Sequence, residues 1–225
     1  MANVPQRATG KGEEAELNVP KAVVSRLSLY LRELQHLVRE GHSTISSTVL
    51  GERLGLTDAQ IRKDLAYFGQ FGYPGVGYRC DELIREIRAI LGTNRDWSVA
   101  IIGLGNLGTA LIRHAGFARQ GFRIVAAFDV LKSKVGRRVE DIPVYPLDRL
   151  SEVVAQHQIK LGILAVPAAA AQEVADQLVA AGIEGIMNFA PVTVVTPPTV
   201  SRVAVDLAIE LEQLSFAVVN RQENA

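Results

Sequence analysis

The feature that most constrains the fold of this chain is the stretch of residues 97–108, Trp-Ser-Val-Ala-Ile-Ile-Gly-Leu-Gly-Asn-Leu-Gly. The uncharged run from Ser98 to Ile102 predicts a buried strand. The Gly-x-Gly-x-x-Gly turn after it predicts a helix from Thr109 to about Ala118, whose first amides and dipole favour a bound pyrophosphate. The stretch therefore predicts a dinucleotide-binding unit that begins near residue 97.

Each glycine of the turn has a physical role in this prediction. Gly103 permits the tight turn, Gly105 lets the backbone approach a pyrophosphate, and Gly108 lets the helix pack closely on the strand. A second apolar run, residues 124–128, ends in Asp129. A carboxylate there would accept hydrogen bonds from the adenosine ribose hydroxyls and repel a 2′-phosphate, which favours NAD(H) over NADP(H).

Strands and helices alternate with short links beyond Asp129, which is typical of a doubly wound parallel sheet. The expected elements are strands 142–145, 160–166 and 185–189 and helices 147–156 and 168–181. Ligands of such sheets lie beyond the carboxyl ends of the strands. Pro167 and Pro191 could line such a ligand site, or they could simply terminate their strands; the sequence favours both interpretations equally. The expected cofactor residues are Gly103, Leu104, Gly105, Asn106, Leu107, Gly108, Asp129, Val166, Pro167, Asn188, Phe189, Ala190 and Pro191.

A chain of 225 residues is long enough for two compact domains, and the dinucleotide unit leaves residues 1–96 for another. We expect a disordered tail (1–17), a winged-helix domain (18–92), a Rossmann domain (93–203) and a C-terminal helix (204–225). The chain has a single cysteine, Cys80, so we expect neither a disulfide framework nor a metal cluster. No apolar run is long enough for a membrane span or a signal peptide, so we expect a cytoplasmic protein.

The N-terminal region has the order of a helix-turn-helix domain. The periodicity predicts helices over 20–40, from Ser46 or Ser47 to Leu54, over 58–68, and a fourth that is capped by Asp81 and ended by Gly92. Pro20 fits the first helical position, and Thr57 with Gln60 forms a capping box. The apolar positions expected to face inward on the first helix are Val23, Val24, Leu27, Tyr30, Leu31, Leu34, Leu37 and Val38.

The outward face of the helix over 58–68 offers an amide, cations and a phenol, groups that can contact base edges in a major groove. An ordinary solvated helix face explains the same pattern. The Gly- and aromatic-rich residues 69–79 predict a hairpin, a wing for the minor groove with Arg79 near phosphates. The net charge gives little support for DNA binding, because residues 17–96 carry 11 basic and 9 acidic side chains, a net of +2. The expected DNA-binding residues are Ser47, Gln60, Arg62, Lys63, Tyr67, Gly75, Gly77, Tyr78 and Arg79.

The C-terminal segment 207–219 is apolar on nearly every face, so a helix there must be buried. Burial in a partner subunit, by exchange of the helix, is one solution, and docking on its own domain is the other.

The cofactor unit lacks the groups of a dehydrogenase. It has no Tyr-x-x-x-Lys pair and no cysteine, and its histidines, His114 and His157, are poorly placed to donate a proton to a substrate. The sequence therefore favours a sensor over an enzyme. A small NAD-dependent oxidoreductase and a CoA-binding regulator remain as alternatives; Asp129 argues against CoA.

Four motifs together resemble the Rex family of redox-sensing transcriptional repressors: residues 59–69, the wing 75–78, the turn 102–108, and Asn-Phe-Ala-Pro at 188–191. The resemblance covers about residues 18–220. It implies a homodimer with N-terminal winged helices, NAD(H)-binding cores and swapped C-terminal helices. It also implies operator DNA binding that NADH releases and NAD⁺ permits. Arg62, Lys63 and Tyr67 would then contact DNA, and 103–108 with Asp129 would hold the cofactor.

Some positions depart from the family pattern. The family often links a tyrosine after the glycine turn to an aspartate and to an arginine of the first helix. Asp206 and Arg32 match this switch, but His114 stands at the expected tyrosine, and Leu207 stands where a phenylalanine often reaches the partner's nicotinamide pocket. A His–Asp–Arg link would make the switch depend on pH near neutrality.

Overall fold

The computed structural model describes residues 19–222, and the expected tail 1–17 lies outside them. The chain divides into two compact units, with the boundary between Asn94 and Arg95. Each unit has its own apolar core. Within the described residues, no helix has the length and apolar character needed to cross a bilayer.

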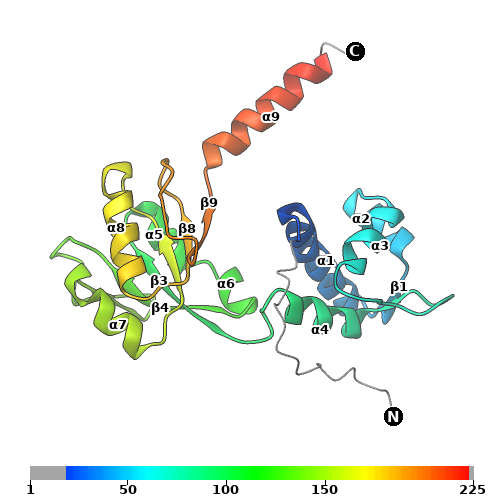
Figure 1. The fold of residues 1–225 in the computed structure, drawn as a ribbon, viewed down its shortest axis with the longest axis horizontal. Helices are drawn as coiled ribbons and strands as arrows, with labels where there is room; N and C mark the ends of the chain where they lie inside the picture. Colours follow the sequence, from blue (N-terminus) through cyan, green and yellow to red (C-terminus); the bar gives the residue numbers. More distant parts are fainter. Residues whose placement is uncertain (1–18, 223–225) are drawn as a thin grey trace. The chain divides into compact units, whose positions relative to one another are not determined.

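The N-terminal unit, as described from residue 19 onward, contains four helices and a two-stranded sheet (Figure 1). The helices are α1 (Lys21–Arg39), α2 (Ser47–Leu54), α3 (Asp58–Ala66) and α4 (Cys80–Ile90). In the small sheet, β1 (Thr44–Ile45) pairs antiparallel with β2 (Tyr78–Arg79). Packing of α1 on α4 and of α2 on α3 encloses a core that includes Leu27, Tyr30, Leu50, Ile61, Leu65 and Ile87.

Several local expectations for this unit need correction. Pro20 is the N-cap of α1 and not its first helical residue, and α4 begins at Cys80 after Arg79, so Asp81 lies in its first turn and is not its cap. Val24 and Val38 are exposed because they lie at the edges of the apolar face of α1.

Only one of the two hydrogen bonds of the predicted capping box is present at the start of α3. The Thr57 hydroxyl accepts the N–H of Gln60 at 3.1 Å, but the Gln60 side chain donates to Asp64 instead of returning to the cap. The helix ends at Ala66, two residues before the expected end, Phe68. The burial of Asp64 explains why the Gln60 amide turns inward.

The predicted wing is a tight turn and not an independent hairpin. The backbone groups of Tyr73 and Gly77 bond to each other in both directions, and Tyr78–Arg79 then pairs with residues 44–45 near α2. Gly77 has φ +86°, and a Cβ there would lie 2.4 Å from the carbonyl oxygen of Ile45. Only glycine therefore lets this turn approach β1 so closely.

The C-terminal unit has a seven-stranded sheet in the order β5-β6-β4-β3-β7-β8-β9. The strands are β3 (Trp97–Ile102), β4 (Phe122–Phe128), β5 (Arg138–Val139), β6 (Ile142–Tyr145), β7 (Leu161–Leu164), β8 (Gly185–Asn188) and β9 (Ser201–Ala204). All pairs are parallel except β5 with β6. Without β5, the order is the 3-2-1-4-5-6 order of doubly wound dinucleotide folds.

Helices cover both faces of this sheet (Figure 1). On one face, α7 (Leu150–Gln156), which follows the 3₁₀ turn Leu147–Arg149, and α8 (Ala168–Ala180) pack on Ala100, Ile102 and Phe128. On the other face, α5 (Asn106–Ile112) and α6 (Gly116–Arg119) pack against the apolar cluster that contains Val99 and Ile101. Successive residues of β3 thus contribute to opposite cores, as the two-residue period of a strand requires.

The single helix predicted over 109–118 is in fact two. It begins at Asn106, directly after the glycines, and is interrupted after Ile112 before α6 begins at Gly116. Strand β9 had no counterpart in the sequence analysis, because its four residues are all exposed and show no alternation.

The last element is α9 (Leu207–Gln222), one continuous helix after β9 (Figure 1). Its apolar side chains are exposed in this chain, and Leu211 and Phe216 reach 66% and 72%. A helix with this much exposed apolar surface is unusual in a single protein chain.

Candidate nucleotide and DNA-binding sites

A cavity of about 510 Å³ lies at the carboxyl ends of β3, β4 and β7. This is the position at which the strand order reverses, because β3 has β4 on one side and β7 on the other. Its walls are mainly apolar and come from the glycine turn, from Asp129, Val130, Leu131 and Lys134, and from Ala165 to Pro167, Ala170, Val174, Leu147 and Phe189.

The glycine turn has the geometry that its sequence predicts. Gly103 has φ +92°, and a Cβ there would lie 2.4 Å from the carbonyl oxygen of Ala165. A Cβ on Gly108 would lie 1.9 Å from the carbonyl oxygen of Gly103. Gly105, in contrast, has nothing within 4 Å of its Cβ position. Gly103 and Gly108 are thus required by packing, whereas Gly105 leaves open space beside the backbone.

Asp129 follows β4, is 6% exposed and contributes to the cavity wall. Its carboxylate accepts the N–H of Leu104 at 2.9 Å and that of Leu131 at 2.8 Å, and it pairs with the Lys134 ammonium at 3.1 Å. Burial alone would raise the pKa of Asp129, but the two N–H groups and the ammonium hold this pKa below its usual value. The carboxylate is therefore ionised and fixed against the glycine turn.

Some predicted cofactor residues do not line the cavity. Asn188 is 2% exposed, and its amide group bonds to the N–H of Ala190 and to the carbonyl of Val192, so in this structure it shapes the loop after β8. Of the four residues 188–191, only Phe189 reaches the cavity. Leu207 lies on α9, 64% exposed and outside the cavity of its own chain.

The outward face of α3 carries the predicted DNA-binding cations. Arg62 bonds to the Ser47 hydroxyl at 3.0 Å and pairs with Asp58 at 2.7 Å, which fixes its guanidinium between α2 and α3. Lys63 is exposed and has no polar partner among the described residues. Tyr67 is 37% exposed. These groups are accessible to a polyanion, whereas Gln60 is half-buried and engaged by Asp64.

Asp64 is the residue of this unit that the sequence analysis missed. It is 0% exposed and accepts bonds from Arg26 of α1 (2.8 Å to Nη2), the Tyr30 hydroxyl (2.6 Å) and the Gln60 amide (2.6 Å). Burial alone would raise the pKa of Asp64, but these donors bring it below its usual value. Its spacing from Ile61 and Leu65 was a signal for an inward position.

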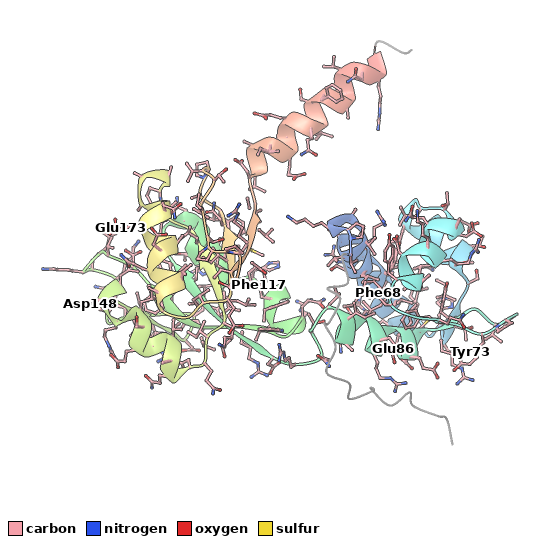
Figure 2. The ribbon with its side chains drawn as sticks, in the orientation of Figure 1. Phe68, Tyr73, Glu86, Phe117, Asp148 and Glu173 are labelled. Atoms are coloured by element: carbon pink, nitrogen blue, oxygen red, sulfur yellow. The ribbon has the colours of Figure 1, made fainter. Side chains whose placement is uncertain are left out.

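Tyr78, predicted as a DNA contact, is instead a core residue. It is 7% exposed and packs in the cluster around Leu27 and Leu50. Gly75 lies in the open part of the turn, and Arg79 is exposed, paired with Glu82 and placed over the ring of Tyr73, which is labelled in Figure 2. The wing thus presents Arg79 and backbone, whereas most of the Tyr78 side chain is buried.

The predicted switch residues lie in both units. Arg32 is exposed on α1, and Asp206 accepts the N–H of Ala208 at the start of α9. His114 is exposed after α5 and contacts the ring of Phe117 edge-on, with ring centres 5.0 Å apart. In the described residues, no hydrogen bond joins His114 to Asp206.

A domain with a capped helix that presents cations, followed by a 3-2-1-4-5-6 sheet with a glycine turn, defines a DNA-binding regulator with a dinucleotide core. Family models agree with this division. One described as "Putative DNA-binding protein N-terminus" matches residues 18–66, and one described as "CoA binding domain" matches residues 94–192.

Whole-chain relatives specify the family. The redox-sensing transcriptional repressor Rex of Pelotomaculum thermopropionicum is 47% identical over 93% of this chain and 98% of its own length, and that of Chloroflexus aggregans is 42% identical over 91% and 97%. The chain belongs to the Rex family of redox-sensing transcriptional repressors.

Solved structures agree with this assignment over nearly the whole chain. RSP, a Rex-family repressor, in complex with β-NAD⁺ and operator DNA matches with a TM-score of 0.86 and 36% identity over 91% of this chain and 94% of that one. RSP in complex with β-NADH matches with a TM-score of 0.82 and 35% identity over 91% and 96%. A repressor acts by occupying DNA and not by turnover, in agreement with the expectation that this chain is no enzyme.

Proposed function

We propose that this protein represses transcription in the cytoplasm as an NADH/NAD⁺ sensor. The supporting observation is the cavity where β3 and β7 diverge, with its glycine turn and ionised Asp129, in a chain that also carries a helix-turn-helix unit. NADH would bind in this cavity and release the protein from operator DNA, whereas NAD⁺ would permit binding. The structures of RSP with each cofactor and with operator DNA support this assignment.

Discrimination between the two cofactors follows from the walls of the cavity. Ala165, Val166 and Phe189 offer apolar surface to the nicotinamide end. The oxidised ring is cationic and loses more hydration free energy in such a site than the neutral reduced ring. Leu207 of the partner subunit would complete this end of the pocket.

The proposed DNA-binding surface is the outward face of α3 with the start of α2 and the wing. Arg62 and Lys63 would contact base edges or phosphates in the major groove, with Ser47 and Tyr67 beside them, and Gly75, Gly77 and Arg79 would lie along the backbone. Gln60 would contribute only if it released Asp64.

A homodimer with exchanged C-terminal helices explains the exposed surface of α9. The apolar side chains of α9 have no cover in one chain. The sheet of the same unit has an apolar hollow of about 290 Å³, lined by Val99, Phe117, Ile124 and Met187 among others, which is surface of the kind that an apolar helix buries. We expect a double substitution, Leu211→Glu with Phe216→Glu, to yield monomers in sedimentation, and Glu212→Gln, on the same helix, to leave the dimer intact. Dimers of the double variant would contradict this assembly.

Such a dimer implies a palindromic operator with half-sites about one helical turn, or a multiple of it, apart. NADH must bind the DNA-incompetent arrangement more tightly than the competent one. By reciprocity, operator DNA must weaken NADH binding by the same factor, typically about 5–150-fold.

The decisive experiment is a gel shift with a palindromic duplex selected from a random library by the NAD⁺-loaded protein. We expect NADH to dissociate the complex and NAD⁺ to preserve it. Gly105→Ala should fold, because the methyl group meets no atom, yet lose the response to NADH by blocking the pyrophosphate. Equal affinity for the duplex with saturating NADH and without cofactor would contradict the proposed function.

The DNA surface is tested by Lys63→Ala. Loss of one phosphate contact should weaken binding to all DNA sequences. It should also reduce the slope of log affinity against log salt concentration by about one. Arg85→Ala is the matched control, since Arg85 is an exposed cation on α4 and is not part of the proposed surface. Equal effects of the two substitutions would show that α3 does not contact the DNA.

The switch that we propose links His114 to Asp206 and Arg32. A histidine changes charge in the physiological pH range, so the link would make the NADH response pH-dependent. His114→Tyr should remove this dependence. A variant with the pH profile of the parent protein would contradict the link.

CoA is a second candidate ligand, because the model that matches residues 94–192 is described as a CoA-binding domain. The ionised Asp129 disfavours a phosphorylated ribose. We therefore expect NADH, and not CoA, to raise the melting temperature of the protein.

A further inference from the structure

Lys134 is the cation closest to the glycine turn, and the sequence analysis gave it no role. Its ammonium donates to the carbonyl oxygen of Leu104 at 2.7 Å and to Oδ2 of Asp129 at 3.1 Å. Asp129 in turn accepts the N–H of Leu104. The pair Asp129 and Lys134 thus binds both backbone groups of the residue between Gly103 and Gly105.

The acceptor capacity of Asp129 is nearly used. An ionised carboxylate offers about four lone-pair sites. Oδ2 accepts from Leu104 and from Lys134, and Oδ1 accepts from Leu131. One site remains, on Oδ1. Asp129 can therefore accept one ribose hydroxyl and not both.

Lys134 has the complementary capacity. An ammonium group has three donors, of which Leu104 and Asp129 take two. The side chain is 34% exposed, and it lines both the dinucleotide cavity and an adjoining hollow beside Gly105, Thr109 and Arg113. The third donor is therefore available to an oxygen atom at the ribose end of the cavity.

We propose that Lys134 binds the adenosine ribose jointly with Asp129, and that its charge sets how strongly the site rejects a 2′-phosphate. This inference rests on the proposed function. Asp129 alone would repel the additional phosphate of NADPH. A cation 3.1 Å from that carboxylate offsets the repulsion and offers the phosphate a partner of opposite charge.

The test compares dissociation constants for NADH and NADPH, measured by titration calorimetry on the full chain. For Lys134→Met we expect NADH affinity to fall about tenfold, from the loss of a charge-assisted bond. NADPH affinity should fall further, so that the ratio of the two constants rises about fivefold. Lys134→Arg, which keeps the charge, should stay closer to the parent ratio than the methionine variant.

Lys132→Met is the matched control, because Lys132 is exposed two residues away and has no polar partner among the described residues. It should change neither affinity. If Lys134 only supported the turn, both affinities would fall by the same factor in Lys134→Met, and an unchanged ratio overturns the inference. Absence of NADH binding by the parent protein overturns the proposed function itself, so the two failures are distinguishable.

Discussion

Each unit of this protein has one buried aspartate next to its functional surface, and the two are held in different ways. Asp64, on α3, is bound by side chains: Arg26, Tyr30 and Gln60. Asp129, after β4, is bound by two backbone N–H groups and one lysine at the edge of a cavity. The first carboxylate joins two helices, whereas the second fixes a turn and lines a cavity.

This difference separates a structural aspartate from the one that we propose binds the cofactor. The Asp64 network is closed, because its donors lie within the domain and its carboxylate is fully buried. It can influence DNA only by positioning α3 relative to α1. The Asp129 network is open on the cavity side, so a ligand can add to it. Burial of a carboxylate therefore does not distinguish the two roles. The kind of hydrogen-bond donor does, since side chains enclose Asp64 whereas mainly backbone N–H groups hold Asp129.

The largest expected effect is on stability. Asp64→Ala leaves the Arg26 guanidinium and the Tyr30 hydroxyl without their partner, and loss of one member of such a pair costs about 3–5 kcal/mol in free energy of unfolding. Asp129→Ala should cost less, about 1–3 kcal/mol, since it leaves mainly backbone N–H groups unpaired. Urea unfolding followed by circular dichroism measures both. Glu82→Gln, which breaks an exposed pair, is the control and should cost under about 1 kcal/mol. Equal losses for the two aspartates would contradict the comparison.

The second effect is on the cofactor. Asp129→Asn should weaken NADH binding by about tenfold or more, because a charged acceptor is replaced by a neutral one. Asp64→Asn should leave NADH affinity unchanged while it weakens binding to operator DNA. Calorimetry with NADH and gel shifts without cofactor provide the two measurements. An Asp129→Asn protein with the NADH affinity of the parent would remove Asp129 from the site.

The smallest effect is a dependence on pH. The pKa of Asp64 is lower in the folded protein than its usual value, so its contribution to stability is complete above the unfolded pKa of about 3.9 and is lost as pH falls through the folded pKa. In that acid range the parent should lose up to about 1.4 kcal/mol per pH unit more than Asp64→Asn. Urea midpoints of both proteins between neutral pH and pH 3 test this. Parallel curves would show that folding does not lower the pKa of Asp64.

The sequence determined the elements with strong local signals. Gly103 and Gly108 have the close contacts that their turn requires, and β6 (Ile142–Tyr145) has its predicted bounds. The alternation of strands and helices was sufficient to predict the doubly wound sheet. These features depend on residues that are near each other in the chain, so that spacing alone reveals them.

Only the tertiary structure decided the partners of the charged and polar side chains. Asp64 meets Arg26 across 38 positions of the chain, and Leu104 meets Asp129 across 25. The same packing buried Tyr78 and Asn188, which the sequence had offered as ligand contacts, and placed Lys134 in the wall of the cavity beside Asp129. Hydrogen-bond partners distant in sequence leave no periodic signal, because the fold, and not local spacing, brings them within bonding distance.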